Sequence, residues 1–184
     1  MVRRLRRAAI AVVPASGATA MLFASSALAC KGTSLQPTHA NLARVTTATL
    51  CLIERERLAY RLEPLHANSS LRRIGSKQAS EMVIGDYFGD DSLSGWTPIQ
   101  RIEASAYAAR ARSLSAGQNI GWGSGTLATP AAMVHAWMLS PPHREIMLSG
   151  GYRDIGVGIA PATPQRSTEG LPGATYAVVF ASRD

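Results

Sequence analysis

The segment DIGVGIA, residues 154–160, constrains the fold more than any other stretch of the chain. Three β-branched residues alternate here with Gly156 and Gly158, and this period of two is typical of a β-strand. Because the glycine face of the strand carries no side chains, another element is expected to pack very close to it. The fold therefore has to contain a strand with one apolar face and one glycine face that the backbone of another element can contact.

Helical patterns lie before this strand, and a second strand pattern lies after it. Apolar spacing and capping residues predict helices at about residues 43–61, 69–84, 98–107 and 130–140. Residues 174–181 are rich in β-formers and predict a second strand. The glycine-rich segment 117–125 predicts an irregular strand or loop. Helices first and strands last indicate the α+β class with a small, mainly antiparallel sheet.

The helix that begins at Pro130 has to end before two consecutive prolines. Pro141 and Pro142 lack amide donors and would clash with the preceding helical turn. His143 follows directly after them. The sequence therefore places an imidazole just beyond the end of an apolar helix.

The first 29 residues differ in kind from the rest. A head with four arginines precedes a mostly apolar stretch and the tripeptide Ala27-Leu28-Ala29, which is the order of a secretory signal peptide and its cleavage site. A retained membrane anchor is the alternative, but Pro14 and Gly17 disfavour it. We therefore expect a signal peptide at residues 1–29, an extended lead-in at 30–41 and one folded domain at 42–184.

The leader also accounts for much of the positive charge. The whole chain has 19 basic and 12 acidic residues and a formal charge of +7. Without the four arginines of the leader, the mature chain keeps 15 basic residues and a formal charge of +3. This small excess, with no Lys/Arg stripe interleaved with aromatic residues, does not predict a nucleic-acid partner. We also expect no membrane span in the mature chain, whose oligomeric state stays open.

Cys30 and Cys51 are the two cysteines of the chain, and both belong to the mature part. In an exported protein an even number of cysteines predicts a disulfide. The bond would close a loop of about twenty residues, add roughly 3 kcal/mol of stability, and tie the lead-in to the first helix. Lipid attachment at Cys30 is the alternative, but Ala27 stands where a lipoprotein signal usually has leucine.

Four motifs together resemble one protein family. They are CLIERERLAYRLEPLHANSSL, GQNIGWG, AWMLSPPHREIML and YRDIGVGIA. In order and spacing they are similar to the bacterial secreted branch of the CAP superfamily, named after cysteine-rich secretory proteins, antigen five and pathogenesis-related one. The similarity covers about residues 42–182. It implies a three-layer α-β-α sandwich with a small antiparallel sheet and a cleft along one edge.

The resemblance also implies a site in that cleft. In relatives the segment that matches SPPHR places its histidine there. Relatives often have a histidine where this chain has Asp90, a glutamate where it has Gln118, and an asparagine where it has Glu54. The predicted ligand groove consists of Asp90, Gln118, Asn119, Ser140 and His143.

These departures leave few metal-ligating or acid-base groups in the predicted groove. A transition-metal site usually needs three or four ligands, with imidazole or thiolate dominant, whereas here only His143 and Asp90 would converge, because Gln118 is a poor ligand. We therefore expect no metal and no other cofactor. A divergent hydrolase that uses His143 with Asp90 remains an alternative, although GWGSGT does not match the G-x-S-x-G pattern.

Binding without catalysis is the favoured interpretation. Tyr87, Phe88 and Trp122 would add aromatic walls to the polar groups, and such a mixture suits an envelope lipid, glycan or peptide. We therefore expect a non-enzymatic, exported CAP-like module at the cell envelope or outside the cell. The other alternative is a structural exported domain without a small ligand, in which Trp122 and Trp137 are core residues and His143 is a structural hydrogen-bonding group.

Overall fold

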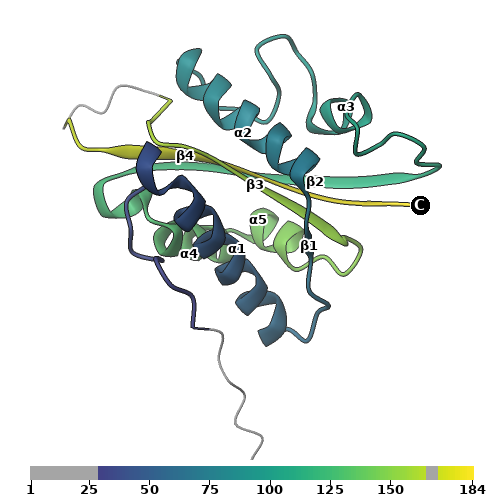
Figure 1. Cartoon of the computed structure of the whole chain (residues 1–184), viewed down its shortest axis with the longest axis horizontal. Helices are drawn as coiled ribbons and strands as arrows, with labels where there is room; N and C mark the ends of the chain where they lie inside the picture. Colours follow the sequence, from purple (N-terminus) through teal and green to yellow (C-terminus); the bar gives the residue numbers. More distant parts are fainter. Residues whose placement is uncertain (1–28, 165–169) are drawn as a thin grey trace, which may run out of the picture.

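The computed structural model describes residues 29–164 and 170–184 (Figure 1). The predicted signal peptide lies outside these residues except for Ala29. The lead-in contains a turn at residues 31–34 and a short 3-10 helix, η1 (His39–Asn41). The α-helices and strands follow from Leu42 onward.

The α-helices of the described ranges are α1 (Leu42–Ala59), α2 (Ser69–Ile84), α3 (Pro98–Glu103), α4 (Pro130–Leu139) and α5 (Pro141–Met147). The strands are β1 (His66–Ala67), β2 (Leu114–Ser124), β3 (Asp154–Ala160) and β4 (Gly173–Arg183), and η2 (Gly125–Ala128) joins β2 to α4. The predicted helices that became α1, α2 and α4, and both predicted strands, are confirmed to within two residues. Within the part of the chain that is described, no helix combines the length and apolar character needed to cross a bilayer.

The strands form one sheet in the order β1-β3-β4-β2. Both β2 and β3 pair antiparallel with β4, and β1 pairs parallel with β3. The sheet is therefore mainly antiparallel, as predicted. Because β1 is only two residues long, most of β3 also lies at an edge of the sheet.

β2 corrects the prediction of an irregular strand or loop at residues 117–125. It pairs with β4 in continuous register along all eleven of its residues. Its glycines reflect close packing: a Cβ on Gly117 would lie 2.6 Å from the Tyr152 hydroxyl, and a Cβ on Gly121 would overlap the Met133 sulfur. Glycine at these positions lets the helical layer approach the strand.

Helices cover both faces of the sheet, which confirms the α-β-α sandwich (Figure 1). α2 and α3 lie on one face, and α1, α4 and α5 lie on the other, where the main core cluster fills the space beside α1 and α4. A Cβ on Gly156 or Gly158 would overlap the backbone of α2. The close contact predicted for the glycine face of β3 is therefore confirmed, and Gly75 of α2 is the residue that meets Gly158.

α3 is shorter than the sequence predicts. It ends at Glu103, four residues before the expected end near Tyr107. The Ser105 hydroxyl donates to the Ile102 carbonyl at 2.7 Å and accepts from the Tyr107 amide at 3.1 Å. These side-chain bonds replace the backbone bonds that a further helical turn would need.

The proline pair ends one helix and begins another. α4 ends at Leu139, as predicted, and α5 starts with Pro141 at its first position. Proline is tolerated there because the amides of a first helical turn have no partner within the helix. His143 is therefore the third residue of a helix, which the sequence pattern did not predict.

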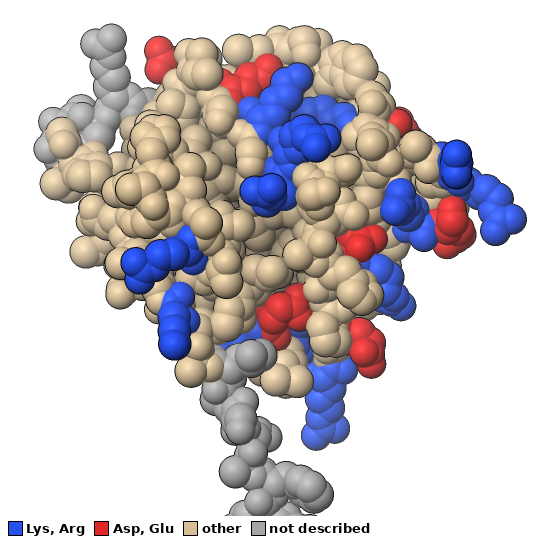
Figure 2. Space-filling model, viewed as in Figure 1, with Lys and Arg blue, Asp and Glu red and all other residues tan. Residues whose placement is uncertain are grey.

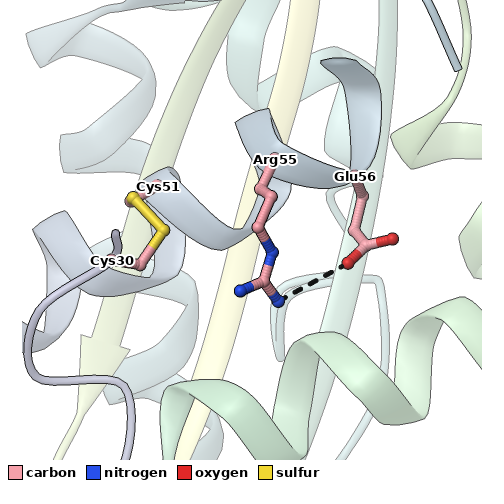
Figure 3. Close-up of a disulfide and its surroundings, with 4 residues drawn as sticks. All are labelled: Cys30, Cys51, Arg55 and Glu56. Atoms are coloured by element: carbon pink, nitrogen blue, oxygen red, sulfur yellow. Dashed lines mark ion pairs between the residues drawn. A yellow bond between two sulfur atoms is a disulfide. The ribbon is translucent and has the colours of Figure 1, made fainter. Parts of the chain in front are cut away.

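Cys30 and Cys51 form the predicted disulfide, with their Cα atoms 5.6 Å apart (Figure 3). The bond joins the lead-in to the middle of α1. Arg55 and Glu56 follow on the same helix and form an ion pair of 3.8 Å. The start of the described chain is thus covalently held against the first helix.

Candidate functional site

A groove of about 350 Å³ lies beside β2, the edge strand opposite β1. Its walls come from β2, α4, the segment after α2 and the start of α5. The apolar residues of its lining are Phe88, Ile120, Gly121, Trp122, Leu127, Ala132, Met133, Ala136 and Trp137, and the polar ones are Ser140 and His143. Phe88 and Trp122 are 43% and 38% exposed, so their rings are accessible from solvent.

Ser140 and His143 form a close pair in the groove. Nδ1 of His143 lies 2.7 Å from Oγ of Ser140. Ser140 precedes α5 as its capping residue, and the side chains of the capping residue and the third residue meet at the start of a helix. The Ser140 hydroxyl makes no hydrogen bond to the backbone of α5 and pairs with the imidazole instead. The pair therefore fixes the orientation of the histidine ring.

Asn119 holds the start of α5 against β2. Its side chain is fully buried, and Nδ2 donates to the His143 carbonyl at 2.9 Å. Its Oδ1 has no hydrogen-bond partner among the residues described. Asn119 does not belong to the groove lining, so its contribution is to position the backbone of His143.

Gln118 and Asp90 lie together in a second polar cluster. Nε2 of Gln118 donates to Oδ1 of Asp90 at 3.1 Å, and Oε1 of Gln118 accepts from Nη2 of Arg101 at 3.0 Å. Arg101 also donates to the Asp90 carbonyl at 2.8 Å and to the Trp96 carbonyl at 2.7 Å. The amide of Gln118 therefore links the loop after α2 to α3.

Burial alters ionisation in this second cluster. Desolvation lowers the pKa of the Arg101 guanidinium, and Tyr87 and nearby carboxylates oppose that change. Desolvation and then Glu81 raise the pKa of Tyr87, whose hydroxyl donates to the Glu81 carboxylate at 3.2 Å. Gln78, fully buried, donates to the Tyr87 hydroxyl at 3.2 Å and to the Gly89 carbonyl at 2.9 Å. The cluster is a network that holds the loop after α2 onto the protein.

The two clusters lie on opposite faces of β2. Successive side chains of a strand point to opposite faces, so Gln118 meets Arg101 of α3 while Asn119 meets α5. Within the described ranges, no hydrogen bond or ion pair joins Asp90 to His143. The structure thus brings Asp90 to Gln118, and it brings both Asn119 and Ser140 to His143. Of these five predicted residues, Ser140 and His143 line the groove.

Sequence reasoning placed only some of the groove walls. Phe88 and Trp122 line the groove as predicted, whereas Tyr87 belongs to the second cluster. The core alternative is wrong for Trp122 and holds for Trp137, which is 2% exposed and donates from Nε1 to the Ile120 carbonyl at 3.0 Å.

Sequence reasoning did not assign Met133, Ala136 and Trp137 to the groove wall or Arg101 to the second cluster. The helical spacing of Met133, Ala136 and Trp137 puts them on one face of α4 and could have indicated a wall. Arg101 gave no such signal, because a charged residue on a short helix is typical of a solvated face. Its guanidinium is instead held by carbonyl groups and by Gln118.

Glu54, the third departure from the family pattern, lies outside the groove lining. Its Oε1 accepts a hydrogen bond from the Leu65 amide at 3.1 Å. Desolvation raises its pKa above the ordinary value of 4.5, and the bond from Leu65 opposes that change. Nowhere in the described residues do three or more His, Cys, Asp or Glu side chains gather closely enough to hold a metal ion.

Solved structures of bacterial proteins share this fold. An extracellular protein containing a SCP domain from Bacillus anthracis str. Ames is 19% identical with a TM-score of 0.56, over 77% of this chain and 40% of that one. An outer surface protein from Borrelia burgdorferi is 21% identical with a TM-score of 0.54, over 73% of this chain and 90% of that one. A cysteine-rich secretory protein from Staphylococcus aureus subsp. aureus Mu50 is 21% identical with a TM-score of 0.54, over 76% of this chain and 38% of that one.

Sequence comparison identifies the family. The protein YkwD of Bacillus subtilis strain 168 is 29% identical over 107 residues, which are 58% of this chain and 39% of YkwD. This chain therefore spans well under half of the length of that relative. The model of the family described as "CAP: Cysteine-rich secretory protein family" matches residues 50–180, from the middle of α1 to the last strand. The chain belongs to the CAP family of cysteine-rich secretory proteins.

Proposed function

We propose that this chain is an exported, non-enzymatic binding module whose ligand occupies the groove beside β2. The observation that carries the proposal is an apolar groove of about 350 Å³ with the Ser140–His143 pair in its lining. Such a groove suits a ligand with a largely apolar body and one hydrogen-bonding group. A lipid-like molecule fits these walls better than a glycan, because buried sugar hydroxyls need many polar partners.

Three observations support export. The leader has the charge and apolar order of a signal peptide. The Cys30–Cys51 disulfide is typical of oxidising compartments. The similar structures include a protein described as extracellular and another described as an outer surface protein. Together they favour action at the cell envelope or outside the cell.

One distance favours hydrolysis as a second candidate. The 2.7 Å between Ser140 Oγ and His143 Nδ1 is the separation of a nucleophile and its base. A working pair also needs a group that orients the imidazole, and Asp90 is hydrogen-bonded to Gln118 instead. The helix-start geometry that brings Ser140 and His143 together accounts for the distance without catalysis.

Binding is tested with a fluorescent fatty acid, cis-parinaric acid, titrated into the full chain. We expect saturable binding and a change in the fluorescence of Trp122. Ala136→Trp fills the groove from α4 and should weaken binding at least about tenfold, whereas Ala131→Trp, exposed on the same helix but outside the groove lining, should leave it unchanged. His143→Ala removes one hydrogen-bonding group and should weaken binding about fivefold.

The same protein separates the candidates. Turnover of p-nitrophenyl esters that disappears in both Ser140→Ala and His143→Ala would replace the binding proposal with hydrolysis. Absence of parinaric acid binding, or equal affinity in the Ala136→Trp and Ala131→Trp variants, would contradict the groove as the ligand site.

A further inference from the structure

The edge of the sheet opposite the groove is left partly open. β1 pairs with β3 at only two positions, His66 with Asp154 and Ala67 with Ile155. β3 continues to Ala160 and pairs with β4 alone over that length. In Figure 1, β3 is visible between α1 and α2.

The free part of β3 presents unpaired backbone groups. The Asn68 amide donates to the Ile155 carbonyl at 2.8 Å, so the peptide groups of Ile155 point toward β1. Alternate residues of a strand direct these groups to the same side, so those of Val157 and Ile159 point outward too. Among the described residues, no backbone donor or acceptor meets them on that side.

A slot between α1 and α2 gives access to these groups. Two adjoining hollows, of about 310 Å³ and 340 Å³, follow the edge of β3. Thr46 and Thr47 of α1 and Arg72 of α2 line both hollows, and Val157 forms part of both. The segment 66–68 already lies at one end of the slot as an extended chain paired with β3.

The slot has a basic rim. Arg72 lines both hollows, and Lys31 and Arg44 line a third hollow that adjoins them through Thr47. No acidic residue belongs to any of these three linings. Figure 2, drawn from the same side as Figure 1, shows Lys and Arg side chains on both sides of the middle of this face. An acidic partner is therefore electrostatically favoured.

We propose that this slot binds an extended acidic peptide of about five residues, which adds to β3 as a strand in line with β1. The peptide pairs with the outward N–H and C=O groups of Val157 and Ile159, and its carboxylates meet Arg72 on one rim and Arg44 on the other. Backbone pairing supplies affinity in this mode, and side-chain charge supplies selectivity. The slot is independent of the groove beside β2, since the two lie at opposite edges of the sheet.

Hydrogen exchange of the full chain tests the pairing directly. In the free protein the amides of Val157 and Ile159 should exchange much faster than those of Gly156 and Gly158, which face β4. An acetylated and amidated peptide of alternating valine and glutamate should slow exchange at Val157 and Ile159 about tenfold or more at saturation. The same peptide N-methylated at every residue has no backbone N–H to donate on either edge and should give no protection.

Two α2 variants test the charge. Arg72→Glu, at an exposed position that lines the slot, should weaken peptide binding about fivefold to tenfold. Arg73→Glu, also exposed but outside the linings, should change the affinity less than about twofold. A peptide of alternating valine and lysine should bind much more weakly than the glutamate peptide. Ala136→Trp, which fills the groove beside β2, should leave peptide binding unchanged and so keep the two proposals separate.

Three results would overturn the proposal. The first is unchanged amide exchange at Val157 and Ile159 when the glutamate peptide is present at about 1 mM, which is about the largest dissociation constant expected for a short peptide. The second is protection of both amides in dilute free protein. The third is protection that rises with protein concentration without peptide, because the occupant would then be a second copy of the chain.

Discussion

Gly156 and Gly158 carry a constraint that their neighbours do not. At each position a Cβ would point at the backbone of α2. At Gly156 it would meet Leu71 and Arg72, and at Gly158 it would meet Gly75 and Ser76. A backbone cannot rotate away as a side chain can, so no rotamer change relieves a methyl group there. The alternation in DIGVGIA made this close contact predictable from the sequence, although it did not identify α2 as the neighbour.

Gly158→Ala should therefore destabilise the protein strongly. The added methyl would overlap Gly75 and Ser76 and push α2 off the sheet, so we expect a loss of about 3 kcal/mol or more in the free energy of unfolding. Urea denaturation followed by circular dichroism measures it. Gly89→Ala is the control, because its Cβ would come no closer than 3.9 Å to the Tyr87 ring. Equal midpoints for the two variants would contradict the close packing of α2 on β3.

The site residues show where residue-scale prediction stops. His143 lies in the groove lining, as the family motif implied, but it does so from the third position of α5, a helix that the sequence pattern did not predict. Gln118 and Asn119 were assigned to one site, although neighbours on a strand point to opposite faces. The error came from treating residues 117–125 as an irregular segment. Once β2 is a regular strand, the separation of Gln118 from Asn119 follows.

At the scale of elements, caps predicted the helix starts well. Asn68 accepts from the amides of Ser70 and Leu71 at the start of α2, and Thr97 and Thr129 cap α3 and α4. The ends were less predictable, because they depend on contacts far along the chain. α1 illustrates this: it ends at Ala59, two residues before the predicted end, and a buried arginine in its last turn contacts segments far along the chain.

Arg57 joins the end of α1 to the end of α5. It is 1% exposed, and its guanidinium donates to the carbonyls of Glu63, Met147 and Ser149 at 2.9–3.3 Å. Burial lowers its pKa, and Glu54 opposes that change. No side chain of the described residues forms an ion pair with it. Backbone carbonyls therefore supply the hydrogen bonds that this buried cation needs.

Arg57→Met should lower the free energy of unfolding by about 2–4 kcal/mol, because methionine fills part of the space but leaves the carbonyls of Glu63, Met147 and Ser149 without the guanidinium donor that they share. Arg55→Met, on the same helix, is the matched comparison: its side chain is 48% exposed and pairs only with Glu56, so a change within about 0.5 kcal/mol is expected. Urea midpoints at constant m-value report both. A similar loss in the two variants would show that the carbonyl contacts of Arg57 contribute little.

For the whole molecule, the order of sequence patterns predicted the fold class, and the family motifs predicted the layers. Neither indicated that β1 is only two residues long or that the edge of β3 stays open. The length of an edge strand depends on how the helices beside it pack, and no local residue pattern predicts that packing. The disulfide was predictable, because a signal-peptide pattern suggests an oxidising compartment and two cysteines leave a single pairing.

Removal of the disulfide should destabilise the whole molecule. The Cys30–Cys51 bond spans 21 residues, and the chain-entropy model gives a loss of about 3 kcal/mol for the double variant Cys30→Ala/Cys51→Ala. The midpoint of urea unfolding measures this loss. Dithiothreitol should produce the same loss in the unmodified chain and no further loss in the double variant. If dithiothreitol leaves the urea midpoint of the unmodified chain unchanged, the disulfide does not stabilise the protein.

The two edges of the sheet have a joint consequence. β4 separates the groove beside β2 from the slot beside β3, so a lipid-like guest and an acidic chain would occupy the molecule without competing for space. If both proposals hold, a module built this way would be an adaptor that binds a small apolar ligand and a second macromolecule at the same time. Its measurable signature is a ternary complex in which each guest is retained when the other is added.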